Sequence, residues 1–132
     1  TWKLRPRLES AISRGATDII VLTHVPPFPE VCLHHGVPTA EHLIEYFSNV
    51  GLGTMLTEVA QENRRVRFLV LSGHTHDDAY LRVLPNLRGV VQGAAYGDPA
   101  AQLVTIDPVT REPTFSFRGR RGAWFELDRV AG

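Results

Sequence analysis

The sequence predicts an α/β fold in which a parallel strand-helix-strand unit is followed by antiparallel hairpins. Two short apolar runs, Ile19 to Leu22 and Val66 to Leu71, are bounded by turn residues and are typical of buried parallel strands. Apolar residues between these runs repeat at helical spacing, and the strand-like segments after them flank proline-containing turns. With 43% hydrophobic residues in a chain of 132, there is enough apolar material for a folded core.

The first element is expected to be a short helix from about Pro6 to Arg14, because proline is tolerated in a first helical turn and Gly15 can end the helix. The residues that share its apolar face are Leu8, Ala11 and Ile12. A strand from Asp18 to Thr23 follows.

The middle of the chain predicts a helix with Thr39 as its N-cap. Apolar residues repeat there at helical spacing: Leu43, Ile44, Phe47 and Val50. Gly51-Leu52-Gly53 is expected to break the pattern, which Met55, Leu56, Val59 and Ala60 then resume. This order predicts a right-handed parallel crossover, which would bring the carboxyl ends of both strands to one edge of the sheet.

Two hairpins are expected next, because strand-like segments flank turn residues. The first joins Ala79–Leu84 to Leu87–Gln92 around Pro85-Asn86, and the second joins Gln102–Asp107 to Thr114–Arg118 around Pro108. Residues 118–132 form a basic and aromatic C-terminal tail. We interpret the arginines of this tail as solvated, and its aromatic part (Trp124, Phe125) is expected to dock on the body or on another subunit.

Three histidines lie at the predicted carboxyl ends of the two buried strands. His24 follows the first strand, and His74 and His76 follow the second in the sequence Gly-His-Thr-His. Ligands of open α/β sheets gather at this edge, and neutral imidazole is the commonest protein ligand of transition metals. Gly73 permits a sharp turn into the site. The sequence therefore predicts a metal site at this edge.

The strings VLTHVPPF and VLSGHTH resemble the last two signature blocks of the calcineurin-like metallophosphoesterases. The resemblance implies that residues 1–132 are the C-terminal part of a single domain, the C-terminal half of a two-sheet α/β/β/α sandwich. It also implies that His24 and His74 bind one ion of a two-metal centre and that His76 binds the other. The family's Asp-x-His, Gly-Asp and Gly-Asn-His-Asp/Glu blocks, which lie upstream of these two, do not occur before His24 in this sequence, so an N-terminal half is expected to precede it.

The activity implied by this resemblance is hydrolysis of a small phosphomonoester or phosphodiester, with a metal-bound water as the nucleophile and two divalent ions of Mn, Fe, Zn or Ni. No side chain of this chain needs to be catalytic, because the general acid would come from the N-terminal half, and the isolated chain is expected to be inactive. His35 and Tyr96 are candidate substrate contacts, although a solvated loop histidine and a packed tyrosine are the alternatives. Asp77 and Asp78 are either acceptors for a ligand imidazole or exposed turn residues.

Other features narrow the function class. The formal net charge is zero, so no global field attracts nucleic acid or an anionic membrane. No apolar run is long enough to span a bilayer, and the single cysteine, Cys32, cannot form an intrachain disulfide. We therefore expect a cytoplasmic protein. Two alternative hypotheses are a non-catalytic scaffold or regulatory module of the same fold, and a small protein with a mononuclear zinc site built from the three histidines.

Overall fold

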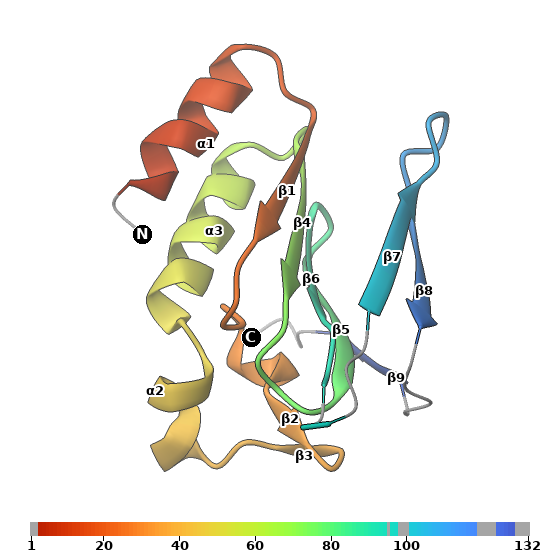
Figure 1. Ribbon diagram of the computed structural model, residues 1–132. Coiled ribbons are helices and arrows are strands. Elements are labelled where there is room, and N and C mark those ends of the chain that lie inside the picture. Colours follow the sequence, from red (N-terminus) through yellow and green to blue (C-terminus); the bar gives the residue numbers. More distant parts are fainter. Residues whose placement is uncertain (1–2, 95, 98–100, 119–123, 129–132) are drawn as a thin grey trace.

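The computed structural model describes residues 3–94, 96–97, 101–118 and 124–128 (Figure 1). The helices are α1 (Leu4–Ser13), α2 (Ile44–Phe47) and α3 (Val50–Glu62), with 3₁₀ turns η1 (Pro29–Val31) and η2 (Glu41–Leu43). The strands are β1 (Asp18–Leu22), β2 (Leu33–His34), β3 (Val37–Pro38), β4 (Arg67–Ser72), β5 (Asp78–Leu84), β6 (Leu87–Val91), β7 (Ala101–Ile106), β8 (Pro113–Arg118) and β9 (Trp124–Asp128).

The main sheet has the strand order β1-β4-β6-β5-β9. Strand β4 pairs in parallel with β1 on one side and with β6 on the other, whereas β5 and β6 form an antiparallel hairpin. Strand β9 runs parallel to β5 at the far edge. This confirms the expected parallel strand-helix-strand unit and the two hairpins. The second hairpin, β7–β8, is a separate two-stranded sheet.

One face of the main sheet packs against α1 and α3 (Figure 1). Side chains alternate between the two faces of a strand, and the members that point to the helices are almost fully buried. From the sheet these are Val21, Phe68, Val70, Leu81 and Val91, which join Leu8, Leu56 and Val59 of the helices in one hydrophobic cluster. Each fully buried side chain of this size stabilises the fold by about 1.5–3 kcal/mol.

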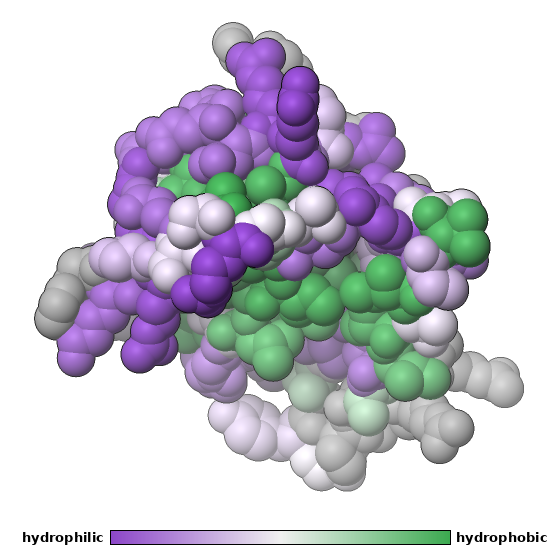
Figure 2. Space-filling view, turned by 90° about the horizontal axis from the view of Figure 1, so that it is seen from above, coloured by the Kyte–Doolittle hydropathy of each residue, from purple (hydrophilic) through white to green (hydrophobic). Residues whose placement is uncertain are grey.

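The opposite face is covered only in part. Leu69 and Val90 are buried on this face, and the ring centroid of Tyr80 lies 6.2 Å from that of Phe115 in β8. On β1, however, Ile20 is 47% exposed and Leu22 is 76% exposed. Figure 2 shows hydrophobic residues at the surface between the main sheet and the β7–β8 hairpin. The hairpin thus covers the centre of this face and leaves β1 open.

The structure corrects the prediction for the middle of the chain. Thr39 is not an N-cap, because its hydroxyl donates a 2.7 Å hydrogen bond to the carbonyl oxygen of Cys32. Gly51 and Gly53 lie inside α3, and the helical pattern is interrupted before them, at Ser48 and Asn49. Asn49 caps α3 by accepting a 3.1 Å hydrogen bond from the backbone N–H of Leu52.

Gly53 has a tertiary role that its sequence context does not reveal. A Cβ atom at this position would collide with the carbonyl oxygen of Pro27 and would press on the ring of Phe28. The glycine therefore lets the start of α3 approach the segment after His24 closely. Glycine has a low helix propensity, but at this position of α3 there is no room for any larger residue.

The remaining differences between the prediction and the structure concern where helices and strands begin and end. Helix α1 begins at Leu4 rather than Pro6, and β1 ends at Leu22 as an assigned strand, although the backbone N–H of Thr23 still donates a 3.0 Å hydrogen bond to Leu71. In the predicted tail, Arg118 belongs to β8 and residues 124–128 form β9. The expectation for Arg120 and Arg121 lies outside the described residues.

Candidate metal centre

The two histidine-bearing turns are joined through the backbone at the carboxyl ends of β1 and β4. The N–H of Gly73 donates a 3.1 Å hydrogen bond to the carbonyl oxygen of His24. The segment after His24 is held in turn by Pro26, whose carbonyl oxygen accepts hydrogen bonds from Asn49 N–H at 2.8 Å and from the Ser48 hydroxyl at 3.1 Å. The site therefore rests on fixed backbone.

His24 and His74 are brought together by this arrangement. Nε2 of His24 lies 3.1 Å from Nδ1 of His74, and their ring centroids are 4.9 Å apart with an interplanar angle of 72°. Two nitrogens that each lie about 2.0–2.1 Å from one zinc-like ion are about 3.3 Å apart in tetrahedral geometry. The observed separation is that of a hydrogen bond between the two rings, in which one nitrogen donates to the other. Because it is also close to the metal-bound value, the pair is spaced like two ligands of one ion that replaces the shared proton.

A backbone carbonyl beside His74 favours one tautomer of its neutral ring. Nε2 of His74 lies 3.3 Å from the carbonyl oxygen of Tyr46. Because a carbonyl only accepts hydrogen bonds, a neutral His74 ring carries its proton on Nε2 and leaves the Nδ1 lone pair directed toward His24. A backbone carbonyl that fixes the tautomer in this way is common around metal-binding histidines.

His74 also has an uncommon backbone conformation, with φ of 74°. A positive φ is infrequent outside glycine, and residues held in such conformations cluster at functional sites. Here it turns the chain sharply, so that the ring of His74 faces His24 while Thr75, which is only 3% exposed, faces the interior. The sharp turn was expected at Gly73 and is shared by His74.

His76 lies beside a different group. Its ring centroid is 4.8 Å from that of His34 and 6.5 Å from that of Tyr96. Among the described residues, no three histidine, cysteine, aspartate or glutamate side chains are grouped so as to hold one ion. The structure thus brings His24 and His74 together as expected and keeps His76 apart from that pair. Whether the three histidines bind metal stays a prediction.

The two aspartates that follow His76 hold the loops around it. Asp78 is 7% exposed and accepts hydrogen bonds from Gly93 N–H at 2.8 Å and from Gln92 Nε2 at 2.7 Å. A Cβ at Gly93 would lie 2.5 Å from the carbonyl oxygen of His76, so this glycine is packed directly against the turn. Asp77 accepts a 2.8 Å hydrogen bond from Gly36 N–H. Asp78 is therefore buried rather than an exposed turn residue.

Of the two predicted substrate contacts, His35 is exposed and contacts His34, with ring centroids 4.2 Å apart, whereas Tyr96 is fully exposed near His76. The sequence placed His34 in the same loop as His35, where a substrate contact or a solvated position was expected, and did not predict that its ring lies against His76. A signal was present: His35 and Gly36, with φ of 53° and 74°, form the two-residue loop between β2 and β3. Such loops favour a glycine and fix which side chain faces inward.

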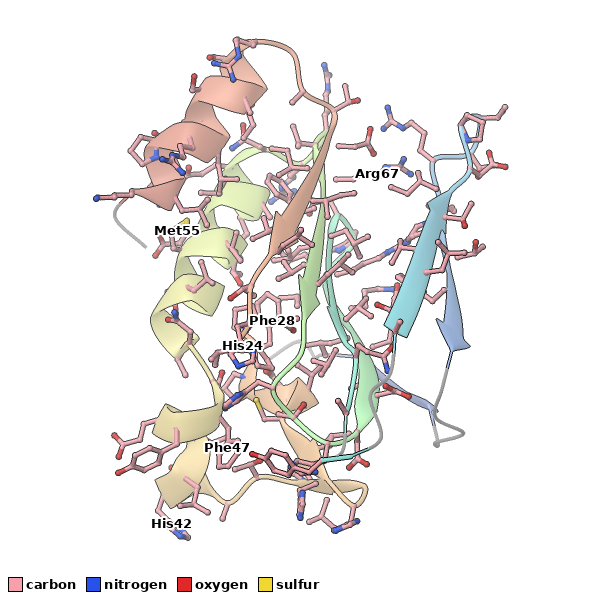
Figure 3. The ribbon with its side chains drawn as sticks, in the orientation of Figure 1. His24, Phe28, His42, Phe47, Met55 and Arg67 are labelled. Carbon is pink, nitrogen blue, oxygen red and sulfur yellow. The ribbon has the colours of Figure 1, made fainter. Side chains whose placement is uncertain are left out.

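Two other side chains, His42 and Cys32, lie outside the candidate centre. His42 is exposed on η2, and Figure 3 shows it at the outer end of the molecule, away from His24. Cys32 is fully buried, and burial raises the pKa of its thiol to about 11. Its thiol is therefore protonated at neutral pH and is not suited to be a nucleophile.

The chain matches no protein-family model, no curated protein sequence and no solved structure. In the part of the chain that the structure describes, no helix combines the length and the hydrophobicity needed to cross a bilayer.

Proposed function

We propose that this chain is the C-terminal part of a metal-dependent phosphoester hydrolase and supplies three ligands of a binuclear centre. The observation that carries the proposal is the pair His24 and His74, whose Nε2 and Nδ1 atoms lie 3.1 Å apart at the carboxyl ends of adjacent parallel strands. Ligands collect at this edge of α/β sheets, and the sequences around both histidines resemble the calcineurin-like metallophosphoesterases.

Each described residue has a distinct part in this proposal. His24 and His74 hold one ion, and the Tyr46 carbonyl keeps the His74 ring in the tautomer that leaves Nδ1 free. His76 binds the second ion. When bound, a pair of divalent ions supplies charge neutralisation for the phosphoryl oxygens and a nucleophile at neutral pH. Imidazole ligands favour Mn, Fe, Zn or Ni.

The proposal also calls for an upstream segment of the same domain. Strand β1 is at one edge of the main sheet, and its exposed Ile20 and Leu22 leave apolar surface uncovered. Strands added along β1 would pair with its open edge, and a second sheet packed on the face that carries Ile20 and Leu22 would cover this surface and complete the two-sheet sandwich. The same segment would supply the remaining ligands, which in this family include carboxylates and an asparagine, and the general acid.

The alternative of a mononuclear zinc site has less support, because no three potential ligands converge among the described residues. Such a site would need all three histidines around one ion in near-tetrahedral geometry. The alternative of a non-catalytic scaffold shares the fold and differs only in having lost the upstream ligands.

The proposal is tested with the full-length protein as the cell makes it. His24→Ala, His74→Ala and His76→Ala are each expected to lower bound metal, measured by inductively coupled plasma mass spectrometry, and to reduce hydrolysis of 4-nitrophenyl phosphate or its bis ester by at least about a hundredfold. His42→Ala is the matched control, because His42 is exposed and distant from the pair. Unchanged metal content in all three variants would contradict the assignment.

A further inference from the structure

A pocket of about 380 Å³ lies next to His76, between the β2–β3 hairpin and the segment that leads into α2. Pockets of this size can hold a small organic group. Its wall is mainly apolar, and the side chains that form it include Leu33, Val37, Pro38, Ala40, Leu43 and Phe47. No lysine, arginine, aspartate or glutamate is among the described residues that line it. This wall suits an uncharged, apolar group and is unsuited to a phosphate chain.

The pocket adjoins both histidine positions of the candidate metal centre. His76 and His34 line it directly. Phe47, also in its wall, has its ring centroid 5.6 Å from that of His74. A phosphoryl group held between the two histidine positions would therefore have this pocket as a neighbour on one side.

A buried polar atom in the pocket wall is an independent sign of a ligand. Thr75 lines the pocket and is 3% exposed, and its hydroxyl has no hydrogen-bond partner among the described residues. Buried hydroxyl groups are normally hydrogen-bonded in native proteins. The hydroxyl oxygen has almost no accessible surface of its own, so a small rotation of the Thr75 side chain would let a bound molecule or its water supply the missing partner.

The pocket is held in place by hydrogen bonds within and around its wall. Asp77 accepts the hydrogen bond from Gly36 N–H, which ties the β2–β3 hairpin to the Gly-His-Thr-His turn at 2.8 Å. Thr39 is tied to the carbonyl oxygen of Cys32 through its hydroxyl at 2.7 Å and its N–H at 2.8 Å. The pocket is therefore formed before any ligand binds.

We propose that this pocket binds the leaving group of the substrate, so that the preferred substrates are phosphoesters of apolar alcohols or phenols. The inference rests on the proposed phosphoester hydrolysis and adds to it the chemical class of the group that is released. The bond between phosphorus and the alcohol oxygen breaks, and the oxygen of a water molecule bonds to phosphorus in its place. The phosphate stays between the histidine positions, and the alcohol leaves from the pocket with the proton that the water releases.

The test uses the metal-loaded full-length protein and alkyl phosphates from ethyl to hexyl, because these primary alcohols differ in apolar length and hardly in acidity. We expect kcat/KM to rise by about fourfold for each methylene that the pocket buries. Binding of the non-hydrolysable ethylphosphonate and hexylphosphonate is measured by isothermal titration calorimetry, which gives a readout that does not need turnover. The same preference for the longer chain is expected there.

Val37→Glu is the informative variant and Val109→Glu is its control. Both valines are exposed, by 62% and 87%, but only Val37 lines the pocket. Val37→Glu should abolish the preference for hexyl over ethyl, whereas Val109→Glu should keep the preference and leave ethyl phosphate turnover within about twofold. Ala40→Trp, which fills the pocket without adding charge, should act like Val37→Glu.

The outcomes separate the two proposals. Equal affinity for the two phosphonates, or an equal loss for both esters in Val37→Glu, would overturn the pocket assignment even if phosphoesters are hydrolysed. A preference for hexylphosphonate that Val37→Glu removes, in a protein that hydrolyses no ester, would support the pocket as an apolar binding site and contradict its role in releasing an alcohol.

Discussion

The two faces of the main sheet are stabilised by different physical interactions. On the helix-covered face, Phe68 is 2% exposed and Val70 is fully buried, and both pack into the cluster with α1 and α3. On the other face, exposure rises toward β1: Val90 is fully buried, Leu69 is 8% exposed and Ile20 is 47% exposed. The first face is covered by α1 and α3, whereas the second is covered only beneath the β7–β8 hairpin.

The hairpin is joined to the sheet by charged groups at one end. Arg67 forms ion pairs with Asp18 at 2.8 Å and with Glu112 at 3.4 Å, and Arg88 forms one with Glu112 at 2.5 Å. Exposed ion pairs contribute about 0–1 kcal/mol each, far less than buried apolar side chains. The helix-covered face therefore contributes most of the stability of the sheet, whereas the other face leaves Ile20 and Leu22 of β1 exposed.

The largest effect is expected when residues 1–132 are produced alone. The open edge of β1 and the exposed Ile20 and Leu22 are conditions that favour aggregation. We expect little soluble monomer, weak metal binding and no phosphoesterase turnover, measured by size-exclusion chromatography, metal analysis and a chromogenic assay. Coexpression of the upstream segment should restore all three.

A double variant tests whether the exposed face of β1 is the surface that the upstream segment covers. Ile20→Lys with Leu22→Lys should raise the soluble fraction of the isolated chain and prevent rescue by the upstream segment, because the charges occupy the surface that the segment would cover. A stable, soluble 1–132 monomer that hydrolyses phosphoesters unaided would contradict the proposal that the chain is part of a larger domain.

Phe28→Ala should have the next largest effect. Phe28 is 1% exposed, and its ring fills the space left by Gly53 and Gly89. Its removal is expected to lower the free energy of unfolding of the full-length protein by about 3–5 kcal/mol, as for other buried phenylalanines, measured by chemical denaturation.

The matched comparison is Leu22→Ala, whose side chain is 76% exposed in this chain. If nothing covers β1, the change should cost less than about 0.5 kcal/mol. A cost of about 2 kcal/mol or more in the full-length protein would show that this face becomes buried there. A cost for Phe28→Ala no greater than that of an exposed residue would contradict the packing described for the helix face.

Much of the sheet could be predicted because its signals are local. The apolar run that contains Phe68 and Val70 identified β4, and the turn at Pro85-Asn86 identified the β5–β6 hairpin. The approach of His24 to His74 followed from parallel pairing, since the carboxyl ends of adjacent parallel strands meet at one edge. These features depend on periodicity and on a general rule of topology.

The features that were missed depend on tertiary contacts. Gly53 was interpreted as a helix breaker because propensity does not record the Pro27 carbonyl that it packs against. The position of His34 beside His76 depends on the two-residue turn at His35 and Gly36. The carbonyl of Tyr46, which sets the tautomer of His74, is a backbone atom and has no sequence signature at all.

The smallest expected effect concerns the ion pairs under the β7–β8 hairpin. The hydrogen bond from Arg88, with help from the charge of Arg67, holds the pKa of Glu112 below its usual value. Burial alone would raise the pKa of Asp18, but the hydrogen bonds from Arg67 and Thr17 outweigh it and lower that pKa. A carboxylate with a depressed pKa in the folded state stabilises the fold fully above its unfolded pKa of about 4, and this contribution is lost as the pH falls through the folded value.

We therefore expect Glu112→Gln to lower the free energy of unfolding of the full-length protein by at most about 1 kcal/mol at pH 7, with the difference from the wild type shrinking as the pH falls below about 4. Added salt should reduce the difference at pH 7, because the pair is exposed enough to be screened. Thermal denaturation at several pH values and salt concentrations measures it, and Glu45→Gln, an exposed carboxylate of α2, is the control. Suppose instead that the difference in unfolding free energy between the wild type and Glu112→Gln grows as the pH falls. The protonated form of Glu112 would then stabilise the fold more than its ionised form, which would contradict the ion pairs as the attachment of the hairpin.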